Sequence, residues 1–264
     1  MSGDRHSQLL LLLLSQGQTS VHEIAAGLNA SLATVRRDLL ELEHLGQVER
    51  LHGAARIATG SHQELAFAAR ERDQIAAKRA IASSAARLIQ PNETVFLDAG
   101  TTVLQLARHI KSRSDPIKVF TNGLVIAQEL AHVSNITVTL IGGRVRPENL
   151  SMVGPAAIAM LDGLWFDRLF LGASAIDADG YVTSLDQDEA ATNARTVQRS
   201  AAVVVLADSS KFNKRITHTV ARLTKGCALI SNAAPTGRFA QVLEKSGATF
   251  MLADRPPREV SSDA

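Results

Sequence analysis

Three short loops in the second half of the chain carry residue types that bind anions. Asp98-Ala99-Gly100-Thr101-Thr102, Thr121-Asn122-Gly123 and Gly142-Gly143-Arg144 each follow an apolar run typical of a strand. A Gly-Thr-Thr turn that opens a helix offers backbone N–H groups, two hydroxyls and the positive end of the helix dipole, which together suit phosphate. Each loop alone also fits a helix cap. Three such loops at the ends of successive strands favour a ligand pocket.

Further polar candidates follow later strands. Asp177 ends the run Gly172–Ile176, Asp186, Asp188 and Glu189 form an acidic stretch that we expect in a loop, and Asp208-Ser209-Ser210-Lys211 follows another apolar run. Carboxylates there would accept hydrogen bonds from sugar hydroxyls, and Lys211 would pair with phosphate. Taken one at a time, these residues equally suit exposed loop charges.

The elements that must position these loops alternate between strand and helix patterns. Strands are expected at 94–97, 117–120, 136–141, 168–172, 202–206, 228–230 and 249–252, and helices at 74–89, 102–110, 124–132 and 155–161. This alternation predicts βαβ units and an α/β domain with a mainly parallel sheet.

The first 57 residues follow a different pattern, that of short helices. A first helix is expected from His6 to Gln16, with Gly17 as its stop, and a second from Ser20, where Ser20 and Glu23 have capping-box spacing. A third is expected from Ser31 to Gly46. Its residues Leu32, Val35, Leu39 and Leu42 recur at helical spacing and predict a buried stripe.

This order of helices is that of a helix-turn-helix, whose third helix enters the major groove of DNA. Arg37 is the better candidate for a base contact and Arg36 for phosphate. Residues 48–57 predict a two-stranded wing around Gly53. The DNA-contacting residues expected on helix and wing are Ser31, Ala33, Thr34, Arg36, Arg37, Arg50, His52 and Arg56. Against this, residues 1–57 carry a net charge of −1, so a protein-interaction module is the alternative.

Composition limits the remaining classes. The chain has 264 residues, 45% of them hydrophobic and 20% charged, which indicates a globular protein of about two domains. Its longest apolar run, Leu9 to Leu14, is far shorter than the roughly 20 residues of a membrane helix. One cysteine and no metal-ligand spacing among eight histidines predict no disulfide, metal site or cofactor. A cytoplasmic protein is the simplest interpretation.

Taken together, the motifs resemble those of the DeoR family of bacterial transcriptional regulators over nearly the whole chain. Thr34-Val35-Arg36-Arg37-Asp38-Leu39 resembles the family's helix-turn-helix signature, and Arg50-Leu51-His52-Gly53 its wing. Phe67-x-x-Arg70 and Lys78-Arg79-x-Ile81-Ala82 resemble its interdomain segment. The three strand-end loops, Gly154-Pro155, the run Gly172–Asp177 and Asp208-Ser209-Ser210-Lys211-Phe212 resemble its sensor domain.

The resemblance implies a winged helix-turn-helix at 1–57, a linker at 58–73 and a sensor similar to ribose-5-phosphate isomerase at 74–255. It implies a repressor of a carbohydrate operon that binds operator DNA and responds to a phosphorylated sugar. Because one recognition helix reads only a few base pairs, we expect a homo-oligomer, either a dimer or a tetramer. Gly100, Thr101 and Thr102 would hold phosphate. The other expected effector contacts are Asp98, Thr121, Asn122, Gly142, Gly143, Arg144, Asp177, Glu189 and Lys211.

The sequence departs from the family pattern at two positions. Ala54 stands where the wing usually has a second glycine, which would strain the turn if that residue needs positive φ. Asn193 stands where the family often has a lysine, so an effector would be less anionic or held differently.

The alternative to regulation is an active sugar-phosphate isomerase, in which Glu189 and Lys211 would move the proton and stabilise the enediolate. The glycine-rich, lysine-containing loop of that enzyme is replaced here by Ser184-Leu185-Asp186-Gln187. This replacement favours the regulator.

Overall fold

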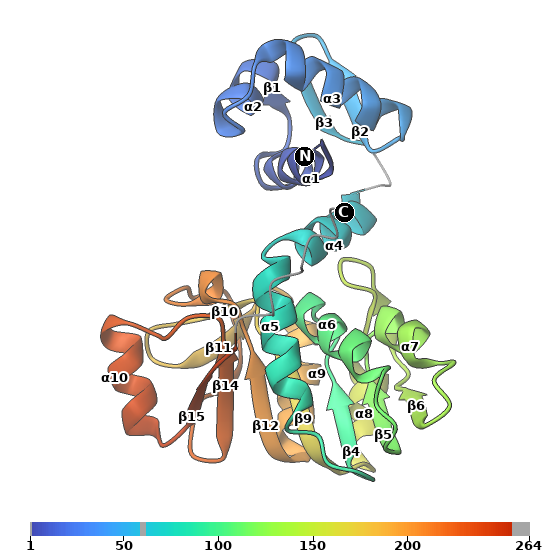
Figure 1. The fold of residues 1–264 in the computed structure, drawn as a ribbon, viewed down its shortest axis with the longest axis vertical. Helices are drawn as coiled ribbons and strands as arrows, with labels where there is room; N and C mark the ends of the chain where they lie inside the picture. The colour runs from blue at the N-terminus through green and yellow to red at the C-terminus, as the bar shows by residue number, and fades with distance from the viewer. Residues whose placement is uncertain (1, 59–61, 255–264) are drawn as a thin grey trace, which may run out of the picture. The chain divides into compact units, whose positions relative to one another are not determined.

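The computed structural model describes residues 2–58 and 62–254, and it divides into two compact units that are treated separately. The first comprises Met1–Asp73 with Pro147–Asn149, and the second the remainder of the chain. The linker expected at 58–73 includes residues 59–61, which lie outside the described part. Most of the expected linker is helical, because α4 spans His62–Arg72 (Figure 1).

The first unit is a three-helix bundle with a small antiparallel sheet. Its helices are α1 (Ser2–Gln16), α2 (Val21–Gly27) and α3 (Leu32–His44), and its strands are β1 (Thr19–Ser20), β2 (Val48–Leu51) and β3 (Ala54–Ile57). The strand order is β1-β3-β2, so the wing predicted at 48–57 is confirmed and gains a third strand that the sequence did not indicate.

Local chemistry explains the boundaries of these helices. Ser20 accepts a hydrogen bond from the Glu23 N–H, and the Glu23 carboxylate accepts one from the Ser20 N–H, which completes a capping box. Gly17 and Gly46 follow helix ends with φ of +73° and +69°. The wing turn needs positive φ only at Gly53, whereas Ala54 is extended and pairs with Leu51. The alanine therefore introduces no backbone strain.

The leucine run of α1 fills the core of this unit. Leu9, Leu10 and Leu13 are buried with Val35, Leu39 and Leu42 of α3, and Leu12 and Leu14 pack partly against the same cluster. Most leucines of the run therefore pack inside this unit. On another side of α1, Arg72 of α4 donates a hydrogen bond to Ser7 Oγ at 3.2 Å.

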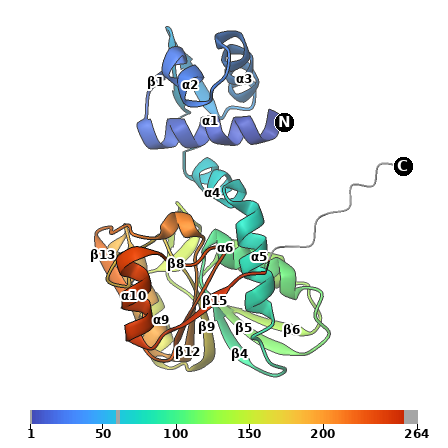
Figure 2. The same ribbon diagram turned by 60° about the vertical axis from the view of Figure 1, so that its left-hand side comes forward.

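The second unit is built on a seven-stranded parallel sheet with the order β15-β14-β12-β9-β4-β5-β6 (Figure 2). The strands are β4 (Thr94–Leu97), β5 (Ile117–Thr121), β6 (Ile136–Leu140), β9 (Phe166–Gly172), β12 (Ser200–Leu206), β14 (Cys227–Ser231) and β15 (Thr249–Leu252). All seven predicted strands are present, which confirms the parallel α/β architecture.

Helices cover both faces of this sheet. They are α5 (Ile75–Ala86), α6 (Thr101–Ile110), α7 (Leu124–Leu130), α8 (Pro155–Asp162), α9 (Gln187–Gln198) and α10 (Gly237–Ser246). Phe96, Phe166 and Phe170 are fully buried in the sheet core, and the rings of Phe96 and Phe166 lie 5.1 Å apart. Helices α9 and α10 were not predicted.

Several smaller elements lie outside the main sheet. Strands β7 (Arg144–Arg146) and β8 (Ser151–Val153) form a hairpin, and β10 (Ala175–Ile176), β11 (Tyr181–Ser184) and β13 (His218–Arg222) form an antiparallel sheet. The acidic stretch expected in a loop is instead the start of α9, where Asp186 caps the helix by accepting from the Glu189 N–H at 2.8 Å. An acidic first turn stabilises a helix through its dipole, which is why these residues are helical.

Among the described residues, no helix combines the length and apolarity needed to cross a bilayer.

Candidate DNA-binding and effector-binding sites

The start of α3 presents two arginines to solvent. Arg36 and Arg37 are exposed, and within the described residues neither has an acidic partner at ion-pair distance. Ser31 is the N-cap, accepting from the Thr34 N–H at 3.1 Å, and its hydroxyl lies 2.8 Å from the Thr34 hydroxyl. Ser31 and Thr34 therefore order the first turn of α3, which directly precedes the arginines.

The wing arginines are already paired within the unit. Arg50 lies 3.3 Å from the Glu43 carboxylate, and Arg56 lies 2.6 Å from that of Glu49. His52, at the tip of the wing, is exposed. A phosphate that binds Arg50 or Arg56 must therefore compete with a carboxylate.

Asp38 is a buried residue of α3. The sequence placed it in the family's helix-turn-helix signature but predicted no role for it. Its carboxylate is 1% exposed and accepts two hydrogen bonds from Arg5 of α1, while His6 Nε2 lies 3.3 Å away. The hydrogen bond from Arg5 is the main cause that lowers the pKa of Asp38. His6, Asp38 and Glu41 also place ligand atoms within 4.8 Å of one another, but Arg5 occupies both Asp38 oxygens. The group is therefore best described as an ion-pair network that fixes α3 on α1.

The three loops predicted to bind an anion lie at one edge of the parallel sheet. Leu97 is in register with Thr121, and Thr121 with Leu140, so the residues after β4, β5 and β6 emerge side by side. Gly172 ends β9, the neighbour of β4 on the other side. This edge is the carboxyl end of every strand in the sheet, where α/β domains bind ligands.

Asp98 directly follows β4 at this edge. It is buried, and its Oδ2 accepts a hydrogen bond from the Gly172 N–H at 3.0 Å. Burial, followed by the negative charge of Glu189, raises the pKa of Asp98 to about 7. Asp98 therefore keeps its proton to a higher pH than an ordinary carboxyl group, and in the protonated form it can donate as well as accept a hydrogen bond.

The phosphate-type loop precedes α6 as expected. Gly100 is the extended N-cap, and no side chain caps the first turn, so the N–H groups at Thr101 and Thr102 remain directed out of the helix end. A Cβ at Gly100 would come within 3.3 Å of Gly172 Cα, and one at Gly143 within 2.9 Å of the Val153 carbonyl oxygen. Close backbone approach explains glycine at both positions.

Thr121 and Asn122 have different roles although they are adjacent. The Thr121 hydroxyl donates to the Leu97 carbonyl at 2.6 Å and accepts from the Gly123 N–H, so it ties β5 to β4. Asn122 is fully buried and near enough to Asp98 to favour its anion. Neither polar atom of its amide has a hydrogen bond of normal geometry within the described part of the chain. A buried amide in that state is a candidate ligand-binding group.

Two further carboxylates at this edge have unused acceptor atoms. Asp177 Oδ1 accepts from the Asp179 and Tyr181 N–H groups, whereas its buried Oδ2 accepts no hydrogen bond and lies 3.6 Å from Arg215. Asp208 is 1% exposed, and its Oδ2 likewise accepts no hydrogen bond from the described residues. Lys211 follows Asp208 by one short 3₁₀ turn and is partly exposed.

The hairpin and α9 bring the remaining predicted residues together through ion pairs. Arg144 lies 2.6 Å from the Asp188 carboxylate, and Arg146 lies 3.5 Å from Asp186 and 3.6 Å from Glu189. Glu189 also accepts a short hydrogen bond from the Ser184 hydroxyl. Arg146, whose side chain is 12% exposed, is a cation of the site that the sequence interpretation did not name.

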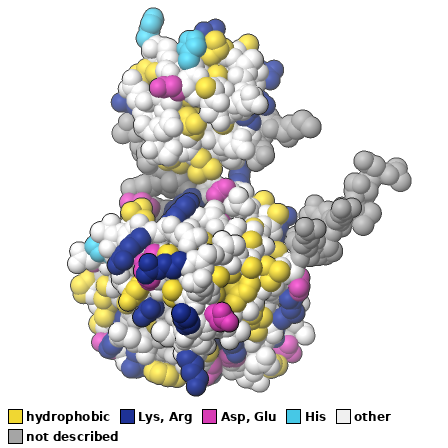
Figure 3. Space-filling view, turned by 90° about the vertical axis from the view of Figure 1, so that its left-hand side faces the viewer, with side chains coloured by type: hydrophobic (Ala, Val, Ile, Leu, Met, Phe, Trp, Pro, Cys, Tyr) yellow, Lys and Arg dark blue, Asp and Glu magenta, His cyan; other side chains and the backbone are white. Residues whose placement is uncertain are grey.

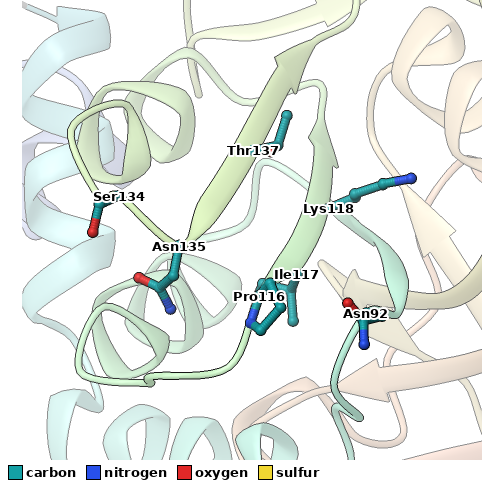
Figure 4. A pocket seen from close by; sticks show the side chains of 7 residues that line it. All are labelled: Asn92, Pro116, Ile117, Lys118, Ser134, Asn135 and Thr137. Carbon is teal, nitrogen blue, oxygen red and sulfur yellow. The ribbon is translucent and has the colours of Figure 1, made fainter.

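A hollow of about 250 Å³ lies at the opposite edge of the sheet, beside the first residues of β5 and β6 (Figure 4). Lys118 is its one charged lining residue, and the Asn135 amide already donates to the Arg113 and Asp115 carbonyls. It shares no residue with the predicted sites.

Comparison with known proteins agrees with this two-part arrangement. A model described as the DeoR C terminal sensor domain matches residues 73–233, and one described as the DeoR-like helix-turn-helix domain matches residues 5–60. The chain belongs to the DeoR family. Family membership makes it a DNA-binding transcription regulator, and not the isomerase-type enzyme weighed from the sequence.

Relatives of this DeoR protein include named repressors. It is 33% identical over 221 residues to the "Putative aga operon transcriptional repressor" of Escherichia coli O157:H7, covering 83% of this chain and 82% of the relative. It is 34% identical over 230 residues to the "Lactose phosphotransferase system repressor" of Staphylococcus aureus, covering 86% and 90%. A ribose 5-phosphate isomerase from Methanocaldococcus jannaschii aligns with a TM-score of 0.39 and 16% identity, covering 51% of this chain and about half (53%) of the isomerase.

Proposed function

We propose that this DeoR regulator represses a carbohydrate operon and that a phosphorylated sugar, bound at the carboxyl edge of the sheet, controls its affinity for operator DNA. The observation that carries the proposal is the set of buried acceptors at this edge. Asn122, Asp177 and Asp208 each keep a buried polar atom that has no hydrogen bond from the described residues, and α6 begins at the same edge with no side-chain cap. A ligand with one anionic end and several hydroxyls satisfies both features.

The proposed ligand places its phosphate on the N–H groups and hydroxyls of Thr101 and Thr102, next to Gly100. Its hydroxyls donate to Asn122, Asp177 and Asp208. Arg146 supplies the positive charge that a lysine at the position of Asn193 would provide. Both residues lie near Glu189: Arg146 forms an ion pair with it, and Asn193 is one helical turn further along α9. The name of the lactose phosphotransferase system repressor supports a carbohydrate operon as the target of this chain.

On the DNA side, Arg37 contacts a base edge and Arg36 a phosphate, with Arg50, His52 and Arg56 of the wing along the backbone. One recognition helix reads only a few base pairs, so we propose that the protein acts as a homo-oligomer on repeated half-sites in the cytoplasm.

Titration tests the proposal directly. The full chain is bound to labelled DNA from upstream of its own and neighbouring genes, and ribose 5-phosphate, fructose 1-phosphate, galactose 6-phosphate or inorganic phosphate is added. Calorimetry on the same samples reports whether each compound binds. We expect at least one sugar phosphate to bind and to shift DNA affinity by roughly tenfold or more. A compound that binds the protein through Thr101 yet leaves DNA affinity unchanged contradicts the proposal.

A further inference from the structure

Positive charge is concentrated in the last part of the sensor unit. Residues 200–254 contain seven basic residues and three acidic ones, whereas the whole chain has a net charge of only +2. The basic residues are Lys211, Lys214, Arg215, Arg222, Lys225, Arg238 and Lys245. Figure 3 shows basic side chains gathered around an acidic one on the face of this unit that carries α10.

Several of these residues form one connected surface, which we call the cationic surface: Lys214, Arg215, Arg222, Lys225 and Arg238. All five are exposed. Arg222 on β13 pairs across the strands with Tyr181 on β11, and the guanidinium carbons of Arg222 and Arg215 lie 5.1 and 5.9 Å from the Tyr181 ring centre. Arg238, in the first turn of α10, lies 2.5 Å from Asp179, whose backbone carbonyl also accepts from Arg222.

These contacts hold the arginines in place while leaving them open to solvent. A guanidinium stacked on an aromatic ring loses little of its capacity to donate hydrogen bonds, and its orientation is already restricted before a ligand arrives. Side chains of Arg215 and Arg238 are 66% and 70% exposed. Asp179 partners Arg238 and Asp177 lies 3.6 Å from Arg215, and two carboxylates cannot neutralise five cations.

The unit that contains the helix-turn-helix lacks this excess of positive charge. Residues 1–57 have a net charge of −1, and Arg5, Arg50 and Arg56 are each paired with a carboxylate. Non-specific affinity for DNA comes from neutralising phosphates. A DNA-binding chain whose helix-turn-helix contributes so little net charge needs phosphate contacts from elsewhere.

We propose that the cationic surface binds the phosphate backbone of duplex DNA without regard to sequence. Arginine forks match phosphate oxygens and make contacts that position a protein on DNA but do not read bases. An acidic protein is the other class of partner with matching charge. DNA is favoured because this chain is a DNA-binding regulator, and because arginine, rather than lysine, is held by the rings and backbone at the centre of the surface.

The test compares two variants that lose the same charge. One is Arg222→Gln/Lys225→Gln/Arg238→Gln, which leaves Arg215 intact because it contacts Asp177 of the proposed effector site. The matched control is Arg87→Gln/Lys111→Gln/Lys118→Gln, which removes three exposed cations: the residues that follow α5 and α6, and one residue of β5. Binding of each full-length protein to a random-sequence duplex of about 40 base pairs is measured by anisotropy over a range of salt concentrations.

We expect the slope of log affinity against log salt to become shallower by about 2 to 3 for the first variant and to change by less than about 0.5 for the control. Light scattering and thermal unfolding establish that both variants keep the assembly and stability of the parent. Equal slopes for the two variants overturn the proposal. Loss of binding to poly-glutamate by the first variant, with its DNA slope unchanged, also overturns it and assigns the surface to an acidic protein.

Discussion

Arg5 of α1 donates two hydrogen bonds, 2.5 and 2.8 Å long, to the carboxylate of Asp38, a buried residue on the inner side of the recognition helix. The Arg5–Asp38 pair joins α1 to α3 at the residue next to Arg37, so it fixes the position of the part of α3 that carries Arg37. Arg5→Leu leaves a buried carboxylate beside only His6, and we expect the melting temperature of this unit to fall by roughly 5 °C or more. The double variant Arg5→Leu/Asp38→Leu should lose less than Arg5→Leu alone, as measured by calorimetry. Equal losses in both would show that the pair contributes little.

The same pair predicts how the unit responds to acid. Because Arg5 lowers the pKa of Asp38 in the folded state, the pair stabilises the fold fully above the usual carboxyl pKa of 3.8, and this contribution is lost as pH falls through the lowered value. In Arg5→Leu the stabilisation is absent at neutral pH, so the difference in melting temperature between the parent and this variant should narrow below pH 3.8. A constant difference down to pH 2 would contradict this assignment.

Asp98 should have the opposite pH dependence. Its pKa is about 7 in the folded protein, against 3.8 for the solvent-exposed carboxyl group of the unfolded chain. Between these two values the folded state binds more protons than the unfolded state. The free energy of unfolding therefore falls as pH rises from about 4 to 7. Asp98→Asn removes this loss. We therefore expect the variant to gain stability relative to the parent, by a few kcal/mol at most, as pH rises to about 7. Unfolding by urea at pH 5 and pH 8 measures the gain, and Asp179→Asn serves as a partly exposed control.

The two proposed sites should be separable by mutation. Arg37→Ala is expected to weaken specific DNA binding by about 1–3 kcal/mol while sugar-phosphate binding is unchanged. Thr101→Val removes one hydroxyl at the start of α6 and should weaken or abolish the effector response while DNA binding survives. Anisotropy and calorimetry on both variants give the four measurements. If each variant impairs both activities equally, the two-site scheme is wrong.

Arg146 provides a test of the effector site that the sequence did not suggest. Its replacement by Gln should weaken sugar-phosphate binding about tenfold, because a charge-assisted hydrogen bond is lost in a largely buried position. Arg144→Gln is the matched control from the same hairpin, since Arg144 is 59% exposed and its ion pair with Asp188 is screened by solvent. Calorimetric titration with the same compound compares the two, and a larger loss for Arg144→Gln would exclude the proposed role of Arg146.

The strength of each sequence signal explains what could be predicted. The seven parallel strands are buried apolar runs, and the first helices have caps and glycine stops, so both were found from residue type and spacing. Helix α9 was missed because Asp186, Asp188 and Glu189 look like loop residues until Asp186 is recognised as an N-cap followed by an acidic first turn. The sheet β10-β11-β13 depends on pairing Tyr181 with Arg222, about forty residues apart, which local patterns do not reveal.

The same distinction applies to the candidate sites. The strand-end loops could be predicted because parallel strands bring their carboxyl ends to one edge. The contacts of Arg5 with Asp38 and of Arg146 with Glu189 could not, because each joins side chains from separate elements whose relative orientation depends on packing. For Asp38, a charged residue beside the apolar stripe of α3 was the available signal.

The ion pairs of the wing also bear on how quickly such a regulator finds its target. Because Arg50 and Arg56 already hold Glu43 and Glu49, every backbone contact they make requires an exchange of one anion for another. Such an exchange yields little net attraction to DNA of arbitrary sequence, so the helix-turn-helix unit would dissociate rapidly from sites other than its operator. Long residence would then arise only where Arg37 also finds its base.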